Sequence, residues 1–316
     1  MSSEIKTIAI TGATGFVGSV LTRRLAVCGC RVKALVRPGS FHKRPADTDV
    51  RWIKGDLEDI ESLRHLIRDA DAMVHCAGVV RGATMAEFDR VNVEGMARLA
   101  KLAGAQRPAP HLLLISSLAA REPHLSFYAA SKRRGEKVLE KKSDNLFWTI
   151  FRPSAIYGQG DRELMPVFQW MKKGLAPILG SGEGRFSLLY VEDLVDAIVQ
   201  WLAGNKGNAG CTYELHDGRP GGYSWHDVID TVAQLRPGKN MIVIKVPLIV
   251  AKLFAKLNLI AARVIGYAPM LTPGKIRELS HSNWVCDNTA LNIATGWIPR
   301  TQLSDGLQRT LCCNGI

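Results

Sequence analysis

A short run of β-branched and apolar residues near the start of the chain leads directly into a stretch rich in glycine. Thr7–Thr11 is typical of a strand, and Gly12, Gly15 and Gly18 follow before a helical pattern begins. Between a strand and a helix, such glycines allow a tight turn, close approach of a pyrophosphate to the backbone, and packing of helix on strand. The helix N-terminus adds free N–H groups and a positive dipole end. We therefore predict a dinucleotide site, although glycines of a plain turn form a similar pattern.

The first half of the chain alternates short apolar runs with longer amphipathic segments. This alternation is typical of an α/β fold, in which helices cover a parallel sheet. We expect strands at Thr7–Thr11, Arg31–Val36, Val50–Lys54, Ala72–His75, Leu112–Ser116 and Phe147–Phe151. We expect helices near Val17–Cys28, Ile60–Arg68, Ala86–Gly104 and Ser126–Lys142. Six strands joined by crossover helices predict a doubly wound sheet with ligands at the carboxyl ends of its strands.

The regular alternation stops after Pro153, where turns rich in glycine and proline follow. We predict a nucleotide-binding domain over residues 1–154 and a smaller, mixed C-terminal substrate lobe over residues 155–316. Phe186–Val191 is typical of a strand, and a helical pattern comes after it. We therefore expect residues 185–204 to return to the sheet of the first domain.

Composition and charge exclude several classes of protein. Apolar residues make up 47% of the 316 residues and charged residues 22%, which argues against a disordered chain. The seven cysteines are scattered and no secretory pattern opens the chain, so we expect a cytoplasmic protein. The net charge of +12 favours an anionic partner, but the basic residues lack the interleaved aromatics of a nucleic-acid platform. We expect a small-molecule substrate and no nucleic acid, and we leave a homodimer open.

Tyr128 and Lys132 lie four residues apart at the start of the helix expected after the fifth strand. This spacing places both side chains on one face of the helix. A free phenol has a pKa of about 10, and a nearby ammonium would lower that pKa toward neutrality, which would suit an acid/base group. The position at the end of the sheet that carries the glycine loop favours catalysis over an ordinary surface contact. Histidines and cysteines lack partners at metal-binding spacing, so we expect no metal.

The spacing Gly-x-x-Gly-x-x-Gly over residues 12–18 resembles that of the extended short-chain dehydrogenase/reductase family, whose nucleotide-binding domain has the Rossmann fold. Asp56-Leu57 is similar to the family's adenine-contacting pair. Ala77-Gly78 is similar to its Asn-Ala-Gly element, with Cys76 in place of the Asn, and Asn92 resembles the Asn that borders the site. The resemblance implies that the cofactor-binding residues include Gly12, Thr14, Gly15, Phe16, Val17, Gly18, Asp56, Leu57, Ala77, Gly78, Asn92, Tyr128, Lys132 and Pro153.

The same resemblance assigns catalytic roles to three residues. Ser117 at the end of the fifth strand would orient the substrate carbonyl, with Ser116 as the alternative. Tyr128 would be the acid/base, and Lys132 would tune Tyr128 and hold the nicotinamide ribose. The catalytic residues are therefore expected to be Ser117, Tyr128 and Lys132.

Arg37 lies at the end of the second strand, where an acidic residue would favour NAD. A guanidinium is a planar donor suited to a 2′-phosphate, and further basic residues surround it. We therefore expect NADP to be preferred over NAD, unless these residues only form a solvated basic loop.

These residues predict an NAD(P)-dependent oxidoreductase that acts on a secondary alcohol or its ketone. Only ten residues separate Ser117 from Tyr128, whereas the resemblance implies a longer insert at this point in sugar-nucleotide epimerases. Leu118-Ala119-Ala120 stands where the resemblance implies an acidic pair in a sugar dehydratase, so dehydration is disfavoured. The first alternative is a nucleotide-sugar 4-epimerase that retains its NAD, and the second is a non-catalytic dinucleotide-binding assembly or sensor protein. Exchange of NADPH favours the reductase, and tightly held NAD favours the epimerase.

Residues 247–265 form a helical pattern that combines apolar and basic side chains. Lys252, Lys256 and Arg263 share one side of the helix, and apolar residues occupy much of the rest. The segment is an ordinary core helix, a lid over a lipophilic substrate such as a steroid or flavonoid, or a helix that contacts a membrane surface. The charged residues interrupt the apolar stretch and argue against a membrane-spanning helix.

Overall fold

The centre of the molecule is a parallel sheet of seven strands. The computed structural model describes residues 6–44, 49–141, 146–204, 209–235 and 240–312. The strand order is β11-β6-β5-β4-β1-β2-β3, so the chain moves outward from β1 in one direction and then in the other. The strands are β1 (Thr7–Thr11), β2 (Arg31–Val36), β3 (Val50–Lys54), β4 (Ala72–His75), β5 (His111–Ile115), β6 (Trp148–Pro153) and β11 (Cys211–Leu215).

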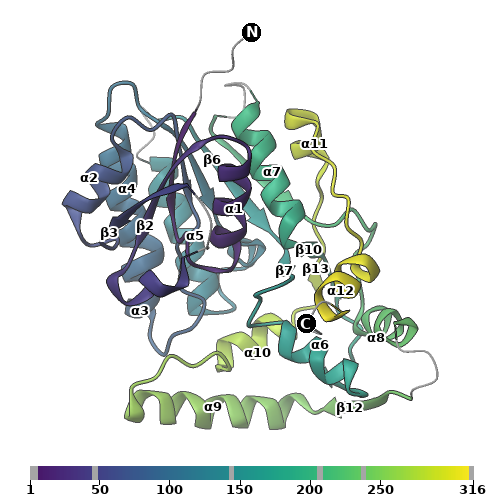
Figure 1. Ribbon diagram of the computed structural model, residues 1–316. Helices are drawn as coiled ribbons and strands as arrows, with labels where there is room; N and C mark the ends of the chain where they lie inside the picture. Colours follow the sequence, from purple (N-terminus) through teal and green to yellow (C-terminus); the bar gives the residue numbers. More distant parts are fainter. Residues whose placement is uncertain (1–5, 45–48, 142–145, 205–208, 236–239, 313–316) are drawn as a thin grey trace.

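Helices cover both faces of this sheet (Figure 1). They are α1 (Phe16–Val27), α2 (Ile60–Ile67), α4 (Met96–Gly104), α5 (Phe127–Lys141) and α7 (Val191–Ala203). On one face, α1 and α7 pack together over a core that includes Leu21 and Ile198. On the other face, α2, α4 and α5 bury Leu63, Met96 and Leu139. The two separate cores, one on each face, confirm the predicted doubly wound fold.

Most expected elements occur within one or two residues of their predicted bounds. The helix expected over Ala86–Gly104 differs, because it consists of α3 (Met85–Asp89), a π-helical turn (Arg90–Gly95) and α4. Short 3₁₀ turns follow β2 at Pro38–Lys43 and β5 at Leu118–Arg121. Lys142, the predicted end of the fourth helix, lies outside the described residues.

The expectation that a strand at Phe186–Val191 rejoins the central sheet is wrong. That strand, β10 (Leu188–Tyr190), pairs in parallel with β7 (Ala155–Tyr157) in a separate two-stranded sheet. The place beside β6 is taken by β11, with Cys211 opposite Thr149. The apolar pattern predicts a buried strand but does not identify the strand with which it pairs. The partner of β10 is β7, which follows β6 directly in the sequence but lies outside the central sheet. Helix α7 of this segment does pack on the sheet, against α1.

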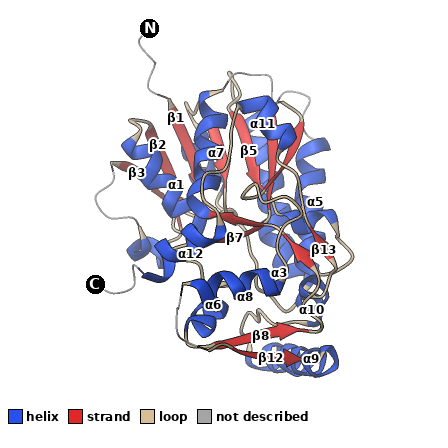
Figure 2. Cartoon of the chain, turned by 90° about the vertical axis from the view of Figure 1, so that its right-hand side faces the viewer, coloured by secondary structure: helices blue, strands red, loops and turns tan. Residues whose placement is uncertain are grey.

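Apart from α7 and β11, most of the second half of the chain forms a lobe at the carboxyl ends of the central strands (Figure 2). Met165, Phe168, Ile178 and Val228 belong to a core of its own. Its helices are α6 (Met165–Lys172), α8 (Trp225–Gln234), α9 (Leu248–Ile265), α10 (Pro273–Leu279) and α12 (Leu303–Cys312). Helix α11 (Thr289–Thr295) packs instead on β11, and its Leu291 belongs to the core beneath α1 and α7. Its other strands are β8 (Leu175–Leu179), β9 (Arg185–Phe186), β12 (Ile242–Val246) and β13 (Asn283–Trp284).

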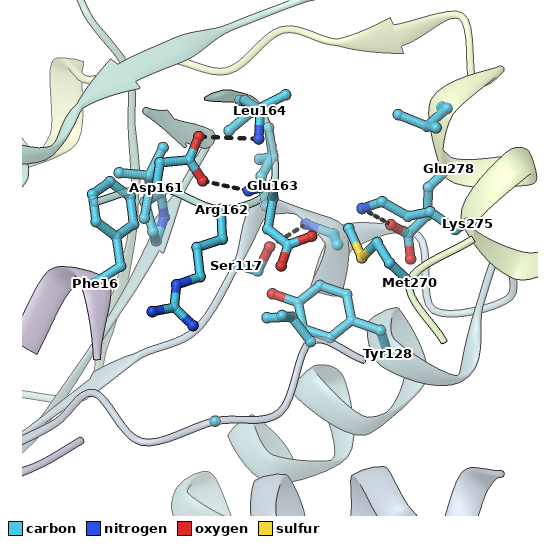
Figure 3. Close-up of a pocket in the computed structure, with 18 of the residues that line it drawn as sticks. Phe16, Ser117, Tyr128, Asp161, Arg162, Glu163, Leu164, Met270, Lys275 and Glu278 are labelled. Atoms are coloured by element: carbon cyan, nitrogen blue, oxygen red, sulfur yellow. Dashed lines mark hydrogen bonds and ion pairs between the residues drawn. The ribbon is translucent and has the colours of Figure 1, made fainter. Parts of the chain in front are cut away.

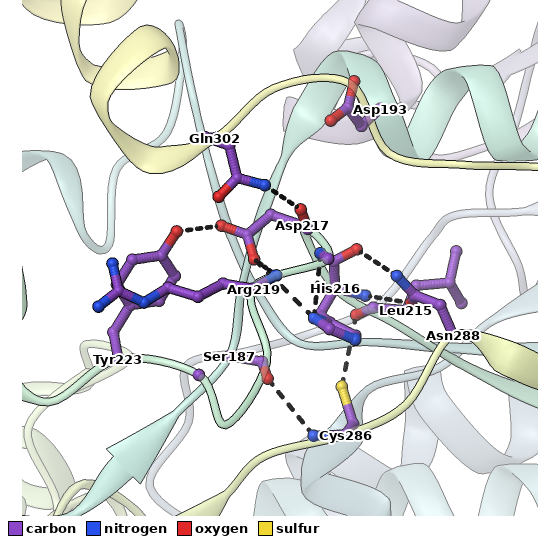
Figure 4. Close-up of polar contacts among 12 residues, drawn as sticks. Ser187, Asp193, Leu215, His216, Asp217, Arg219, Tyr223, Cys286, Asn288 and Gln302 are labelled. Carbon is purple, nitrogen blue, oxygen red and sulfur yellow. Dashed lines mark hydrogen bonds and ion pairs between the residues drawn. The ribbon is translucent and has the colours of Figure 1, made fainter.

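A buried polar cluster fastens the C-terminal segment to the end of β11 (Figure 4). The backbone N–H of His216 donates to Asn288 Oδ1 at 2.7 Å, and Asn288 Nδ2 donates to the His216 carbonyl at 2.8 Å. Gln302 Nε2 donates to the Asp217 carbonyl at 2.7 Å, and Tyr223 donates to the Asp217 carboxylate at 2.5 Å. Because these groups bond to one another, the cluster serves to hold the two lobes together.

Candidate active site

The turn between β1 and α1 brings backbone rather than side chains to the carboxyl end of the sheet. Gly12 has a φ of +73°, and a Cβ there would lie 2.6 Å from the backbone N of Ala77. A Cβ on Gly18 would lie 2.1 Å from the Gly12 carbonyl oxygen, so glycine is required for α1 to begin this close to the strand. Gly15 is the N-cap of α1 and supplies no capping side chain, which leaves N–H groups of the first turn available to an anion.

A cavity of about 1520 Å³ extends from this turn along the carboxyl edge of the sheet and into the second lobe. All the predicted site residues except Asn92 line it. They are Gly12, Thr14, Gly15, Phe16, Val17, Gly18, Arg37, Asp56, Leu57, Ala77, Gly78, Ser117, Tyr128, Lys132 and Pro153. The structure therefore brings together residues from most of the first half of the chain.

Asn92 lies in the π-helical turn, behind the wall of the cavity. Its Oδ1 accepts from the Val79 N–H at 2.9 Å, and its Nδ2 donates to the Val79 carbonyl at 3.1 Å and to Ser131 Oγ at 2.9 Å. These bonds tie the loop after β4 to α5. Asn92 thus positions the loop that carries Gly78 and the helix that carries Tyr128.

Tyr128 and Lys132 occupy successive turns at the start of α5, and Ser117 follows β5. Figure 3 shows the hydroxyl groups of Ser117 and Tyr128 facing one another inside the cavity, and the two side chains share a hydrogen bond. Lys132 is buried, and its Nζ donates to the Ile115 carbonyl at 2.9 Å. The three side chains predicted to be catalytic therefore line the same cavity.

Burial controls the proton affinity of this pair. It raises the pKa of Tyr128 to about 12, with further contributions from Glu278 and Glu163, while the hydrogen bond with Ser117 acts in the opposite direction. It lowers the pKa of Lys132 to about 8, although Glu136 and Cys76 oppose this shift. The expectation that the ammonium draws the phenol's pKa toward neutrality is thus not met by the protein's own groups, because desolvation dominates. At neutral pH these groups hold Tyr128 as a phenol, which can donate a proton.

The two serines at the end of β5 have different partners. Ser116 is buried and bonds to Glu136 at 2.5 Å. The Glu136 carboxylate, which is fully buried, also accepts from Arg152 at 2.9 and 2.6 Å. Ser116 is therefore engaged beneath the site, whereas Ser117 presents its hydroxyl to Tyr128.

The family model described as the NAD dependent epimerase/dehydratase family matches residues 8–215. The chain belongs to this family. The resemblance to extended short-chain dehydrogenases/reductases, first indicated by the glycine spacing, is thereby confirmed, and the chain is an enzyme of an NAD-dependent family.

The proteins similar to this chain include two whose names refer to lipid substrates. A ceramide reductase of Caulobacter vibrioides is 34% identical over 315 residues, which cover 96% of this chain and 93% of that protein. A sterol-4-alpha-carboxylate 3-dehydrogenase of Candida albicans is 26% identical over 355 residues, or 98% of each chain. A UDP-glucuronic acid 4-epimerase from Bacillus cereus, solved with UDP-glucuronic acid and NAD, has a TM-score of 0.74 at 18% identity over 96% of this chain and 97% of that one. This last likeness shows the shared fold.

The backbone of this family member fits a dinucleotide at the glycine loop. The close approach of Gly12 to Ala77 and of Gly18 to Gly12 leaves the loop free of side chains where phosphates would lie. Gly78 adds a second point without a side chain. Its backbone lies close to Lys132, since a Cβ there would be 3.4 Å from Lys132 Nζ. The residues present therefore suit the cofactor that the family uses.

Charged residues of the second lobe also line the cavity near Tyr128, and the sequence did not predict them (Figure 3). Lys275 Nζ pairs with Glu278 Oε2 at 2.9 Å on α10, and the other Glu278 oxygen accepts from Ser126. Glu163 pairs with Arg81 at 2.9 Å. The i, i+3 spacing of Lys275 and Glu278 is visible in the sequence, but nothing there places α10 against α5.

Two further findings concern metals and membranes. Within the part of the chain that the structure describes, no three or more His, Cys, Asp or Glu residues are grouped so that they could hold a metal ion. None of the described helices has the length and apolar character needed to cross a membrane.

Proposed function

We propose that this enzyme is an NAD(P)-dependent reductase that converts a ketone of a lipophilic substrate into a secondary alcohol. The observation that carries the proposal is the environment of Tyr128. Its phenol, whose pKa burial raises to about 12, is protonated at neutral pH and lies beside Ser117, in a cavity that runs from the glycine loop to an apolar end. A protonated phenol supplies the proton that ketone reduction requires.

Each catalytic side chain has a role that follows from its position. Ser117 donates a hydrogen bond that orients the substrate carbonyl, and Tyr128 delivers a proton to the carbonyl oxygen. Lys132, held by the Ile115 carbonyl, fixes the nicotinamide ribose and supports Tyr128. The nicotinamide, when bound, supplies the hydride. The engagement of Ser116 by Glu136 supports Ser117 as the catalytic serine.

The far end of the cavity supports a lipid-like substrate. It is lined by apolar residues of the second lobe: Val246, Leu248, Ala251, Phe254, Met270, Leu271 and Ile276. A nucleotide sugar would place a charged diphosphate or a polar ring against these side chains, which is unfavourable. The two similar proteins that are named for a ceramide and a sterol support the same substrate class.

Turnover with purified protein tests this proposal. We expect NAD(P)H to be consumed when a ketone analogue of ceramide or a 3-keto sterol is supplied in detergent micelles, and not with UDP-sugars. Loss of nicotinamide fluorescence measures the reaction. Tightly retained NAD with interconversion of UDP-sugars would instead support the epimerase, and cofactor binding without turnover of any carbonyl would support the non-catalytic alternative.

We propose that NADP is preferred over NAD, because Arg37, Ser40 and Lys43 line the same end of the cavity. Arg37→Asp is expected to weaken NADP binding at least tenfold, or about 1.4 kcal/mol, and to spare NAD, because only NADP carries the 2′-phosphate. Fluorescence titration of NADPH and NADH measures both affinities. Arg31→Asp, at the opposite end of β2, is the matched control. Equal losses for both cofactors in Arg37→Asp would contradict a 2′-phosphate site.

We place the enzyme in the cytoplasm. The described cysteines Cys28, Cys30, Cys76, Cys211 and Cys286 are free thiols. Free thiols are typical of a reducing compartment.

A further inference from the structure

Helix α9 turns its larger apolar side chains away from the protein. The residues that it buries are Ala251, Ala255 and Ala262, which lie on one side of the helix and face α10 and the lobe. The opposite side, here called the outer face of α9, consists of Ile249, Val250, Leu253, Leu257, Ile260 and Val264. Ile249, Leu253 and Val264 are 78%, 57% and 81% exposed. An ordinary core helix has the reverse arrangement, so the core-helix interpretation does not describe α9.

Positive charge flanks this apolar face. Lys252, Lys256 and Arg263 are exposed and lie along one edge of it, at roughly 100° per residue around the helix. Residues 231–277 of the sequence contain no Asp or Glu. A long apolar face with a purely basic border matches a helix that lies in the surface of an anionic bilayer, where lysine and arginine reach the headgroups.

The position of α9 in the molecule leaves this face accessible. Figures 1 and 2 both show α9 and β12 at the edge of the second lobe farthest from the central sheet. Strand β12 continues the apolar surface, because Ile242, Val243 and Ile244 are also exposed. Contiguous exposed apolar surface of this kind marks an interaction site.

The mouth of the cavity lies beside α9. Phe254, Leu271 and Leu279 line the cavity and are 61%, 38% and 43% exposed, so these side chains form an apolar rim that opens outward. Leu248 and Ala251, from the first turns of α9, line the cavity further in. A hydrocarbon chain can therefore pass from the outer side of α9 into the cavity along apolar side chains.

We propose that the outer face of α9 docks on an anionic membrane surface and that the substrate enters from the bilayer past the rim of Phe254, Leu271 and Leu279. The entry step rests on the proposed lipid-ketone activity, whereas the docking step does not. The alternative is that the outer face of α9 binds a second copy of this chain. Two-fold pairing through this face would bring like charges together without an acidic residue in the segment to pair with them, so the charges favour lipid headgroups.

Co-sedimentation with vesicles tests the docking step. We expect the protein to bind vesicles of phosphatidylcholine and phosphatidylglycerol, and to bind phosphatidylcholine alone at least tenfold more weakly. Lys252→Glu/Lys256→Glu/Arg263→Glu and, separately, Leu253→Ser/Leu257→Ser/Ile260→Ser are each expected to reduce binding at least tenfold. The matched controls are Lys101→Glu/Lys137→Glu/Lys141→Glu and Val27→Ser/Ile293→Ser/Ile298→Ser, which alter exposed residues elsewhere and should bind like wild type.

Activity measurements separate the two steps. The α9 variants should reduce a short, water-soluble ketone at the wild-type rate but a vesicle-embedded keto lipid at least tenfold more slowly. Failure of the proposed activity would abolish both reactions in wild type and leave vesicle binding unchanged. Equal binding to both kinds of vesicle, equal losses in the control variants, or a dimer that the α9 variants convert to monomer in light scattering would each overturn the proposal.

Discussion

Tyr128→Phe is expected to lower ketone turnover 10²–10⁴-fold, or by roughly 3–5 kcal/mol of barrier, and to leave dinucleotide affinity close to wild type. The substitution removes one hydroxyl and keeps the ring that packs 6.3 Å from Phe88, centroid to centroid. The lost group is the buried phenol whose raised pKa keeps it a proton donor at neutral pH. Turnover of the ketone substrate and fluorescence titration of the cofactor measure the two effects.

Tyr157→Phe is the matched control for this prediction. Tyr157 is fully buried and its hydroxyl lies 3.5 Å from the Gln302 carbonyl, outside the cavity. Its loss should leave turnover within a few-fold of wild type. Since Ser117 and Tyr128 act on one carbonyl oxygen, Ser117→Ala/Tyr128→Phe should lose much less than the product of the single effects. A folded Tyr128→Phe enzyme that binds cofactor and keeps more than about a tenth of wild-type turnover would contradict the acid/base role.

Lys132→Met is expected to reduce turnover by a comparable factor and to weaken the dinucleotide at least tenfold, yet to stabilise the fold at neutral pH. The pKa of Lys132 falls from 10.5 to about 8 on burial. Below pH 8 the wild type therefore carries a buried ammonium, which lowers the free energy of unfolding by up to about 3 kcal/mol. The hydrogen bond to the Ile115 carbonyl offsets part of this cost. From pH 8 to about 10.5 the unfolded chain binds more protons than the folded one, so the wild type gains stability and the difference from Lys132→Met shrinks.

Chemical denaturation at a series of pH values measures this dependence. Lys137→Met, which alters an exposed lysine on the same helix, should change neither turnover nor the pH dependence of stability. Parallel curves of unfolding free energy against pH for wild type and Lys132→Met would show that burial does not lower the pKa of Lys132.

The glycine loop, the strand before it and the five strands after it could be predicted because their signals are local. β-branched runs, glycine spacing and the four-residue interval from Tyr128 to Lys132 depend on neighbours in the sequence. Pairing could not be predicted in this way: β11, with Thr212 and Glu214, joins β6 in the central sheet, whereas the fully buried β10 joins β7 outside it. Helix α10 lies so close to the start of α5 that a Cβ on Gly274 would be 2.9 Å from the Ser126 Cβ. This contact joins residues far apart in the sequence, so no local pattern predicts it.

The proton affinity of Tyr128 was predicted in the wrong direction for a related reason. The sequence shows that an ammonium is near, but it does not show how much water both groups lose on folding. Asn92 was placed in the correct neighbourhood, although its amide bonds to Val79 and Ser131 instead of lining the cavity. Only the three-dimensional structure shows which hydrogen bonds a buried amide makes.

The walls of the cavity come from two stretches of chain, one inside and one beyond the part that the family model matches. The glycine loop, Ser117 and Tyr128 lie within residues 8–215, the part that the family model describes. The rim and the apolar end come from the end of β12, from α9 and α10 and from the residues between these helices, all of which lie beyond residue 215. Exchange of this later segment between relatives would therefore alter which molecule is admitted without disturbing the machinery that reduces it. The part of the wall that would select the substrate is thus separate in sequence from the residues that we propose to act on it.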